Sequence, residues 1–364
     1  MLFAFVLVYH KLEFNNQYNR RFEAMTSIEI DPSVQHICVV IPLYNANASI
    51  GQVIKGIPKF VRTIVVVDDC STDDSYERAC LAADERVQVL RNESNQGVGG
   101  TVISGYKKAV ELGANIIVKM DSDGQMDPNY LIPLIAPIIT NRADFTKGNR
   151  FVHAEQLKSM PLVRRIGNAG LSFLTKAASG YWGIFDPTNG YTAIHASLIP
   201  LLNFEKLHKR YFFESSMLIE LGFLRAVVAD VEIPAKYENE VSSLSEWKSL
   251  FEFPPLLLAG FLRRIIIQYF VRDFGAFSML SLLGMFFCFF GLLFGIYKWV
   301  LSIETNIPAT TGTVMIAVLP LILGSELIIQ SLIVDIKNEP SKPIHLEIAA
   351  VEQIYNFFLF SKYM

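Results

Sequence analysis

The sequence predicts an α/β domain built on a parallel β-sheet, followed by helices that enter a membrane. Two observations lead to this prediction. Between residues 36 and 140, short apolar runs rich in β-branched residues alternate with segments of helical pattern, which is typical of βαβ units. Beyond residue 245 the chain becomes strongly apolar, and hydrophobic residues make up 51% of its 364 positions. We expect the α/β domain to span residues 35–244.

Residues 1–34 are expected to be an extension outside this domain. The run Met1–Val8 is apolar but too short to cross a bilayer, and no small-residue cleavage site follows it. Met25 is an alternative start of the protein.

Polar loops follow the first two predicted strands. His36–Ile41 ends in a loop that contains Pro42, Tyr44 and Asn45, and Ser49 is a candidate cap for the short helix after it. Thr63–Val67 ends in a cluster of acids and hydroxyls, Asp68-Asp69-Cys70-Ser71-Thr72-Asp73-Asp74. The helix expected over Ser75–Ala83 needs only one of these as a cap.

A third strand is predicted at Val87–Arg91, and a helix at Thr101–Leu112. The glycines before this helix, Gly97 and Gly99, allow either a phosphate cradle at the helix N-terminus or close packing. The third glycine of a dinucleotide fingerprint is lacking, so both interpretations remain open.

The fourth strand, Ile116–Met120, runs directly into Asp121-Ser122-Asp123, and Gly124 permits a sharp turn. In an extended segment, residues i and i+2 point to the same side, so the two carboxylates face one point. Two hard oxygen ligands without His or Cys suit Mg²⁺ or Mn²⁺ and therefore a diphosphate. In a parallel sheet, ligands bind beyond the carboxyl ends of the strands, where these polar loops converge.

The second half of the domain is predicted to add a helix, three strands and two further helices. The helices are expected over Pro128–Thr140, over Ile166–Ser179 and in a segment that ends at Leu221. The strands are expected over Asp144–Gly148, in a segment through Ile194 and over Ala226–Ile233. Basic residues follow the strand that ends at Gly148, namely Arg150, His153, Lys158, Arg164 and Arg165. Facing an acidic metal edge, Arg150 and one of the paired arginines are candidates for binding a second anion.

The carboxyl-terminal third predicts membrane association. Residues 245–274 contain Pro254-Pro255 and three arginines in an apolar background, typical of helices that lie on a bilayer. Residues 275–334 hold two runs long enough to span, joined by the loop 301–306, and residues 335–364 form a tail. Positive charges flank the hairpin on one side, so both ends are expected in the cytoplasm, as for a bacterial inner-membrane protein. Glu326, inside the second span, indicates contact with a neighbouring helix or with another subunit, and a homo-oligomer is one of these two alternatives.

Composition excludes other classes of function. The formal net charge of -3 gives no indication of nucleic acid as a partner. The four cysteines show neither zinc spacing nor a disulfide framework, which fits a reducing compartment.

Four motifs, in this order and spacing, resemble glycosyltransferase family 2. They are Val39-Val-Ile-Pro42-Leu-Tyr44-Asn45, Val66-Val-Asp68-Asp69-Cys-Ser71-Thr72-Asp73, Asn95-x-Gly97-x-Gly99 and Met120-Asp121-x-Asp123-Gly-Gln125-x-Asp127-Pro128. The turn Asp186-Pro-Thr-x-Gly-Tyr191 and the membrane hairpin are similar to its polyprenyl-phosphate branch, which includes dolichol-phosphate mannose synthase. The resemblance covers roughly residues 38–334.

The resemblance implies a GT-A fold, a Rossmann-like nucleotide-sugar domain. It places Pro42, Tyr44, Asn45 and Asp69 around the base and ribose, and Asp121 and Asp123 on a Mg²⁺ or Mn²⁺ ion at the diphosphate, with Gln125 close by. Arg150 with Arg164 or Arg165 would hold the acceptor phosphate.

Two positions depart from the family pattern. Ala46 replaces the usual Glu after Tyr-Asn, which affects one contact to the nucleotide. Glu214 stands where relatives tend to have Gln, and Ser216 where they have Glu, so the acceptor side differs. With Asp123, the residues Asp186 and Glu214 are the candidates for catalysis.

The expected activity is inverting transfer of a sugar from a nucleotide-sugar to a polyprenyl phosphate in the membrane, supplying lipid-linked sugar for cell-surface glycans. A UDP-sugar is the favoured donor and GDP-mannose the other. An alternative acceptor is a hydroxyl of a lipid-linked saccharide, for which Glu214 would serve as a base. A more remote alternative is a membrane-tethered receiver-like signalling domain, because Asp68, Asp69 and Asp121 each end a strand.

Overall fold

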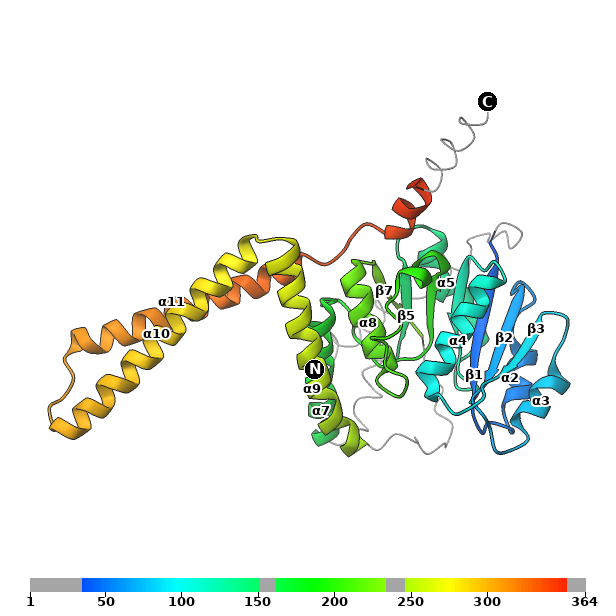
Figure 1. Ribbon diagram of the computed structural model, residues 1–364, viewed down its shortest axis with the longest axis horizontal. Helices are drawn as coiled ribbons and strands as arrows, with labels where there is room; N and C mark the ends of the chain where they lie inside the picture. Colours follow the sequence, from blue (N-terminus) through cyan, green and yellow to red (C-terminus); the bar gives the residue numbers. More distant parts are fainter. Residues whose placement is uncertain (1–34, 151–161, 234–245, 352–364) are drawn as a thin grey trace, which may run out of the picture.

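The computed structural model describes residues 35–150, 162–233 and 246–351. Its α/β domain contains one mixed sheet of seven strands in the order β3-β2-β1-β4-β6-β5-β7 (Figure 1). The strands are β1 (Ile37–Leu43), β2 (Thr63–Asp68), β3 (Val87–Arg91), β4 (Ile116–Lys119), β5 (Phe145–Asn149), β6 (Thr192–His195) and β7 (Val228–Glu232). Of the sequence predictions, the extension 1–34 and residues His153 and Lys158 lie outside the described residues.

Helices cover both faces of the sheet because strand residues alternate between two apolar cores. Cys38 and Val40 of β1 face one core and Ile37 and Val39 the other. The first core contains α4 (Gly97–Glu111), η2 (Ala196–Leu201) and α8 (Phe213–Leu224). The second contains α2 (Ile50–Gly56), α3 (Ser75–Ala82) and α5 (Leu131–Ile139), which follows η1 (Pro128–Tyr130). These elements confirm the predicted α/β class.

The sheet is not parallel throughout. β1–β4 pair in parallel as predicted, but β6 runs antiparallel between β4 and β5. The segment Asp186–Tyr191 turns the chain back at the carboxyl edge before β6 begins, so β6 starts where its neighbours end. As a result the carboxyl ends of β4 and β5 flank the first residue of β6.

Helix α9 (Glu246–Ile266) packs against α7 (Leu162–Ser179) and α8, with Phe253 and Leu257 in the shared core (Figure 1). Two consecutive prolines, Pro254-Pro255, would ordinarily end a helix, but α9 continues through both. Packing of the adjacent apolar residues outweighs the loss of two backbone donors. The π-helical turn η3 (Ile267–Arg272) follows.

Two long helices, α10 (Ala276–Thr305) and α11 (Thr311–Lys337), form a hairpin that extends away from the α/β domain (Figure 1). Both are long and apolar enough to cross a membrane, and so is Phe251–Arg272 by the same measure. The predicted loop at 301–306 is mostly helical, and α11 passes through Pro320 without interruption. Close approach needs Gly324, where an added Cβ would lie 2.7 Å from the backbone nitrogen of Cys288.

Part of the predicted tail returns to the α/β domain as a helix over residues 344–351. The carboxylate of Asp144, at the start of β5, accepts the backbone N–H groups of Ile344 and His345 at 3.0 and 2.9 Å. It also contacts Nδ1 of His345 at 2.7 Å. Burial alone would raise the pKa of Asp144, but these hydrogen bonds lower it below the ordinary value.

Candidate active site

Three loops meet at the carboxyl edge of the sheet, as the sequence predicts. Asn45 lies in the left-handed region with φ of 48°; its Oδ1 accepts the N–H of Thr72 at 2.9 Å and its own N–H donates to Oγ of Ser71 at 3.1 Å. Ser49 does not cap α2 through its side chain; its Oγ donates to the carbonyl of Ser122 at 2.7 Å. The loop after β1 is therefore tied both to the loop after β2 and to the Asp-x-Asp loop.

Pro42 lies within β1, one residue before its end, and Tyr44 follows with half of its surface exposed. The Tyr44 ring is thus presented at the mouth of the site. A planar base stacks on such a ring, so the geometry fits the predicted nucleotide contact.

Asp69 is buried, and its carboxylate accepts hydrogen bonds at the N-terminus of α4. Its Oδ1 accepts the N–H of Gln96 and its Oδ2 the N–H of Gly97, both at 2.8 Å. The N–H of Gly99 donates to the carbonyl of Lys209 at 2.9 Å. The first amides of α4 therefore have protein partners, which favours close packing over a phosphate cradle. Asp69 acts as a cap here, and its predicted contact with the nucleotide remains a prediction.

The Asp-x-Asp pair lies in a turn after β4, not in an extended segment as predicted. Gly124 adopts φ of +80° and the N–H of Gln125 donates to Oδ1 of Asp123 at 2.9 Å. The turn leaves Asp121 and Asp123 partly exposed and Gln125 exposed at the edge. Among the described residues no group of three or more His, Cys, Asp or Glu surrounds a point, so a metal here would need oxygens from a ligand. Two carboxylates from one turn fit Mg²⁺ or Mn²⁺ on a diphosphate.

The last residue of β4, Lys119, links two candidate residues. Its Nζ lies 2.8 Å from Oδ1 of Asp121 and 3.1 Å from Oε1 of Glu214, and the lysine is 1% exposed. Burial would lower the pKa of this amine, but the two carboxylates raise it above its ordinary value. Glu214 opens α8, where a negative charge is favourable.

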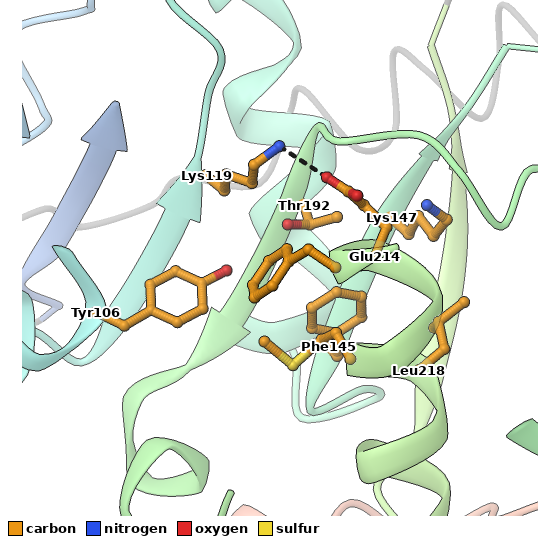
Figure 2. A pocket seen from close by; sticks show the side chains of 9 residues that line it. Tyr106, Lys119, Phe145, Lys147, Thr192, Glu214 and Leu218 are labelled. Atoms are coloured by element: carbon orange, nitrogen blue, oxygen red, sulfur yellow. Dashed lines mark hydrogen bonds and ion pairs between the residues drawn. The ribbon is translucent and has the colours of Figure 1, made fainter. Parts of the chain in front are cut away.

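Glu214 and a second buried lysine, Lys147, both line a small cavity (Figure 2). Lys119 and Lys147 are both in register with Thr192, one on each side of β6. Lys147 donates to the carbonyl of Asn189, and burial lowers its pKa to about 8. Apolar and aromatic side chains complete the lining: Tyr106, Phe145, Phe213, Met217 and Leu218.

Arg150 and Asp186, predicted separately, form an ion pair. Nε and Nη2 of Arg150 lie 2.8 and 3.2 Å from the two oxygens of Asp186. Asp186 is fully buried, whereas the arginine side chain is 38% exposed. Burial would raise the pKa of Asp186, but Arg150 and Lys147 lower it below its ordinary value. The carboxylate therefore holds the guanidinium at the edge of the sheet.

Arg164 and Arg165 lie in the first turn of α7, and their side chains are outside the described residues. Sequence reasoning passed over Lys119 and Lys147. The available signal was a lysine within each buried strand run, since lysine is almost never fully buried unless it is paired.

Comparison with known proteins decides the family. The sequence profile of Glycosyl transferase family 2 matches residues 38–200. The UDP-N-acetylglucosamine–dolichyl-phosphate N-acetylglucosaminyltransferase of Methanococcus voltae is 33% identical over 216 residues, covering 55% of this chain and 86% of the relative. The chain belongs to glycosyltransferase family 2. Membership confirms the predicted GT-A fold and transferase class.

Two further relatives of this family 2 glycosyltransferase are named for polyprenyl acceptors. The undecaprenyl-phosphate mannosyltransferase of Micrococcus luteus is 28% identical, covering 54% of this chain and 82% of the relative. The polyprenol monophosphomannose synthase of Mycolicibacterium smegmatis is 26% identical, covering 58% and 81%. These names confirm the resemblance to the polyprenyl-phosphate branch. Glucosyl-3-phosphoglycerate synthase from Mycobacterium tuberculosis superposes with a TM-score of 0.49 at 21% identity, covering 66% of this chain and 83% of that one.

Proposed function

We propose that this protein transfers a sugar, with inversion, from a nucleotide-sugar to a polyprenyl phosphate in the membrane, providing lipid-linked sugar for surface glycans. The observation that carries the proposal is the combination of the Asp121/Asp123 turn and the Arg150–Asp186 pair at one sheet edge with a membrane hairpin. The names of the relatives support the same acceptor class. A UDP-sugar is the favoured donor, because the Methanococcus voltae relative is named for one, and GDP-mannose is the alternative.

On the donor side, Tyr44 and Asn45 would bind the base and ribose, with Pro42 and Asp69 shaping the loop. Asp121 and Asp123 would hold Mg²⁺ or Mn²⁺, and Gln125 would border the diphosphate. That ion would offset the negative charge that develops on the leaving nucleoside diphosphate.

On the acceptor side, Arg150 would bind the acceptor phosphate, with Arg164 or Arg165 as a second cation. Asp186 would act as a positioning residue, because it is buried against Arg150 and does not face the solvent. A phosphate monoester is largely ionised near pH 7, so its oxygen attacks the anomeric carbon without a strong base. Glu214, already engaged by Lys119, would orient the acceptor and not deprotonate it.

We propose that α9 lies at the bilayer surface, while α10 and α11 span the bilayer. One face of α9 packs on α7 and α8; its other face presents Phe251, Leu258, Leu262 and Ile266, all at least half exposed. A helix that packs on the α/β domain along one side and exposes apolar side chains along the other is suited to the interface between bilayer and water. The charge pattern supports a catalytic domain on the cytoplasmic side, which in bacteria would be that of the inner membrane.

The test uses purified full-length protein with undecaprenyl phosphate, Mn²⁺ or Mg²⁺ and a panel of labelled UDP- and GDP-sugars. We expect label from one donor to move into the organic phase, and EDTA to stop the transfer. Asp123→Ala should abolish turnover, because the metal loses one of its two protein ligands. Intact activity in this variant would refute the metal assignment. Transfer only to a lipid-linked saccharide would move the assignment to a hydroxyl acceptor.

A further inference from the structure

Lys119 is a buried lysine that contacts two carboxylates. It ends β4 at 1% exposure, and its ammonium lies between the carboxylates of Asp121 and Glu214. Gly190 lies against this pair, because an added Cβ there would sit 2.5 Å from Nζ of Lys119 and 2.9 Å from Oδ2 of Asp121. The backbone at Gly190 therefore leaves no room for a side chain beside the Lys119–Asp121 pair.

The two carboxylates that Lys119 joins come from opposite sides of the proposed reaction. Asp121 belongs to the turn assigned to the donor and its metal, and Glu214 opens α8 on the acceptor side. Both acids are partly exposed on their outer sides, whereas the lysine is enclosed. Without the lysine, two like charges would face each other across a desolvated gap.

We infer that Lys119 is a positioning residue that fixes the donor-side carboxylate of Asp121 and the acceptor-side carboxylate of Glu214 as one unit. This inference rests on the proposed function. Lys119 touches neither substrate; it acts by keeping Asp121 turned toward the metal position and by preventing Glu214 from competing for the cation. The effect of removing the charge of Lys119 therefore depends on whether Glu214 is charged.

Mn²⁺ provides a readout that is independent of turnover, because binding removes the electron paramagnetic resonance signal of the free aqueous ion. We would titrate Mn²⁺ with UDP into the full-length protein and into Lys119→Met, Glu214→Gln and the double variant. Lys119→Met should weaken Mn²⁺·UDP binding by about 10-fold or more, the loss expected from one misplaced charged ligand. The double variant should regain most of this loss, since a neutral glutamine needs no cation.

Lys147→Met is the matched control. It removes a buried lysine from the opposite side of Thr192. The Nζ of Lys147 donates to the backbone carbonyl of Asn189, and not to Asp121 or Glu214. We expect its Mn²⁺·UDP affinity to stay within about 3-fold of the parent, while its thermal stability falls because a buried polar contact is lost.

The outcomes separate this inference from the proposed function. Absence of both Mn²⁺·UDP binding and sugar transfer in the parent protein would refute the function. A normal parent with unchanged binding in Lys119→Met would overturn the positioning role alone. Equal losses in Lys119→Met and Lys147→Met, or no recovery in the double variant, would show a purely structural lysine and would overturn it too.

Discussion

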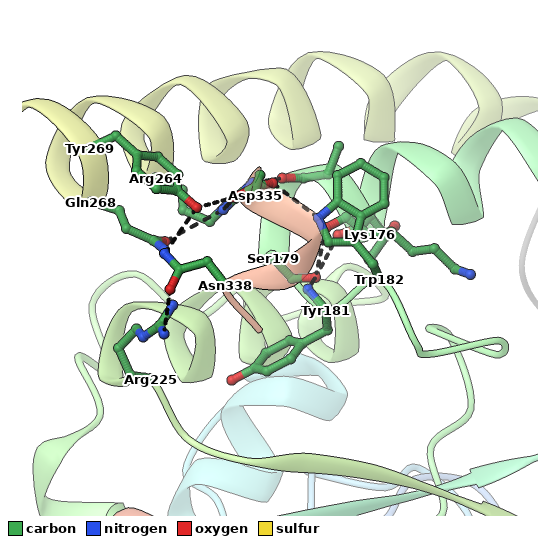
Figure 3. Close-up of polar contacts among 12 residues, drawn as sticks. Lys176, Ser179, Tyr181, Trp182, Arg225, Arg264, Gln268, Tyr269, Asp335 and Asn338 are labelled. Atoms are coloured by element: carbon green, nitrogen blue, oxygen red, sulfur yellow. Dashed lines mark hydrogen bonds and ion pairs between the residues drawn. The ribbon is translucent and has the colours of Figure 1, made fainter. Parts of the chain in front are cut away.

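Two buried cations, Lys119 at the active-site edge and Arg264 at the junction with the membrane hairpin, are held by carboxylates in contrasting ways. Arg264 forms a bidentate pair with Asp335, its Nη1 and Nη2 lying 2.7 and 2.8 Å from the two oxygens (Figure 3). Lys119 divides its charge between two acids that are partly exposed on their other sides. Both cations are 1% exposed, so burial itself does not distinguish the two regions.

The difference lies in what remains for a ligand. At the junction, Arg264 also donates to the carbonyl of Ala177, and Asp335 also accepts from Tyr269 and from Trp182. This network joins α7, α9, η3 and α11 and leaves its acid 2% exposed. At the candidate active site, the carboxylates of Asp121 and Glu214 are partly exposed, so their oxygens still have lone pairs available to a ligand. A closed polar network fixes one domain on another, whereas an open one is prepared to bind.

The largest expected effect on stability follows from breaking the closed network. Arg264→Met should lower the free energy of unfolding by about 3–5 kcal/mol, because Asp335 then stays buried without its cation. Denaturant unfolding of the detergent-solubilised protein measures this loss. Mn²⁺·UDP binding to the folded fraction should not change.

The double variant Arg264→Met/Asp335→Leu is the control for this loss. Replacing a buried ion pair by apolar side chains is often nearly neutral, so much of the stability should return. A single variant as stable as the parent would mean that the junction does not depend on this pair. A double variant no better than the single one would contradict the explanation by an unpaired charge.

A smaller effect, of opposite sign, is expected in the active-site half. Asp230 of β7 is in register with Lys147; its Oδ2 accepts the N–H of Phe185 at 2.7 Å, and its buried Oδ1 has no partner among the described residues. Burial raises the pKa of Asp230 to about 6, only partly opposed by that N–H and by Lys147. The folded state therefore binds the proton more tightly than the unfolded chain, and ionisation costs stability as the pH rises from 3.8 through 6.

Asp230→Asn should consequently stabilise the protein by about 1–3 kcal/mol above pH 6, and the gain should disappear near pH 4. Unfolding curves of parent and variant at a series of pH values test the sign. A variant that is less stable at neutral pH, or a gain independent of pH, would refute the assigned cause. Asp144→Asn is the contrasting case. The pKa of Asp144 is lowered in the folded state, so the ionised acid stabilises the parent protein above its unfolded pKa. The variant should therefore be less stable than the parent, and the difference should be greatest near neutral pH.

In the open region the sequence predicted the acidic and polar loops but not the lysine that joins two of their carboxylates, and in the closed region it predicted none of the contacts. Local motifs carry Asn45, Asp121 and Asp123 to the carboxyl edge, because strand direction alone places them there. Contacts across long separations were not readable: Arg264 pairs with a residue 71 positions away, and Lys119 with one 95 positions away. Both depend on how later elements pack.

Three features differ from what the sequence predicts, and each difference has a physical cause. The extended geometry expected for Asp-x-Asp gave way to a turn because β4 stops at Lys119, whose charge is used inside the sheet. Asp69 lies where predicted, yet it satisfies the amides of α4. The antiparallel β6 has no local signature, because the pattern of apolar residues in a buried strand is the same in either direction.

The smallest expected effect concerns an acid within the membrane hairpin, Glu326 of α11. Glu326 lies on an exposed face of α11, accepting from Nε2 of Gln330 at 2.8 Å within the same helix. A carboxyl group facing acyl chains is costly, and a second copy of α11 would offer it both a donor and an acceptor. We therefore expect a homo-oligomer in which Glu326 contributes about 0.6–1.7 kcal/mol, the average and the maximum found for hydrogen bonds between membrane helices by double-mutant cycles.

Energy transfer between labelled copies, diluted in liposomes, measures this association. Glu326→Leu should weaken it by about 3- to 18-fold, the equivalent of that energy. Ser325→Ala is the matched control: it is exposed on the neighbouring position, and its hydroxyl already donates to the carbonyl of Ile322 in its own helix. An unchanged association in Glu326→Leu, or a monomeric parent, would mean that the acid serves the lipid surface and not another subunit. In that case the membrane hairpin would resemble the active-site edge, an open polar group awaiting a ligand, more than the closed junction beside it.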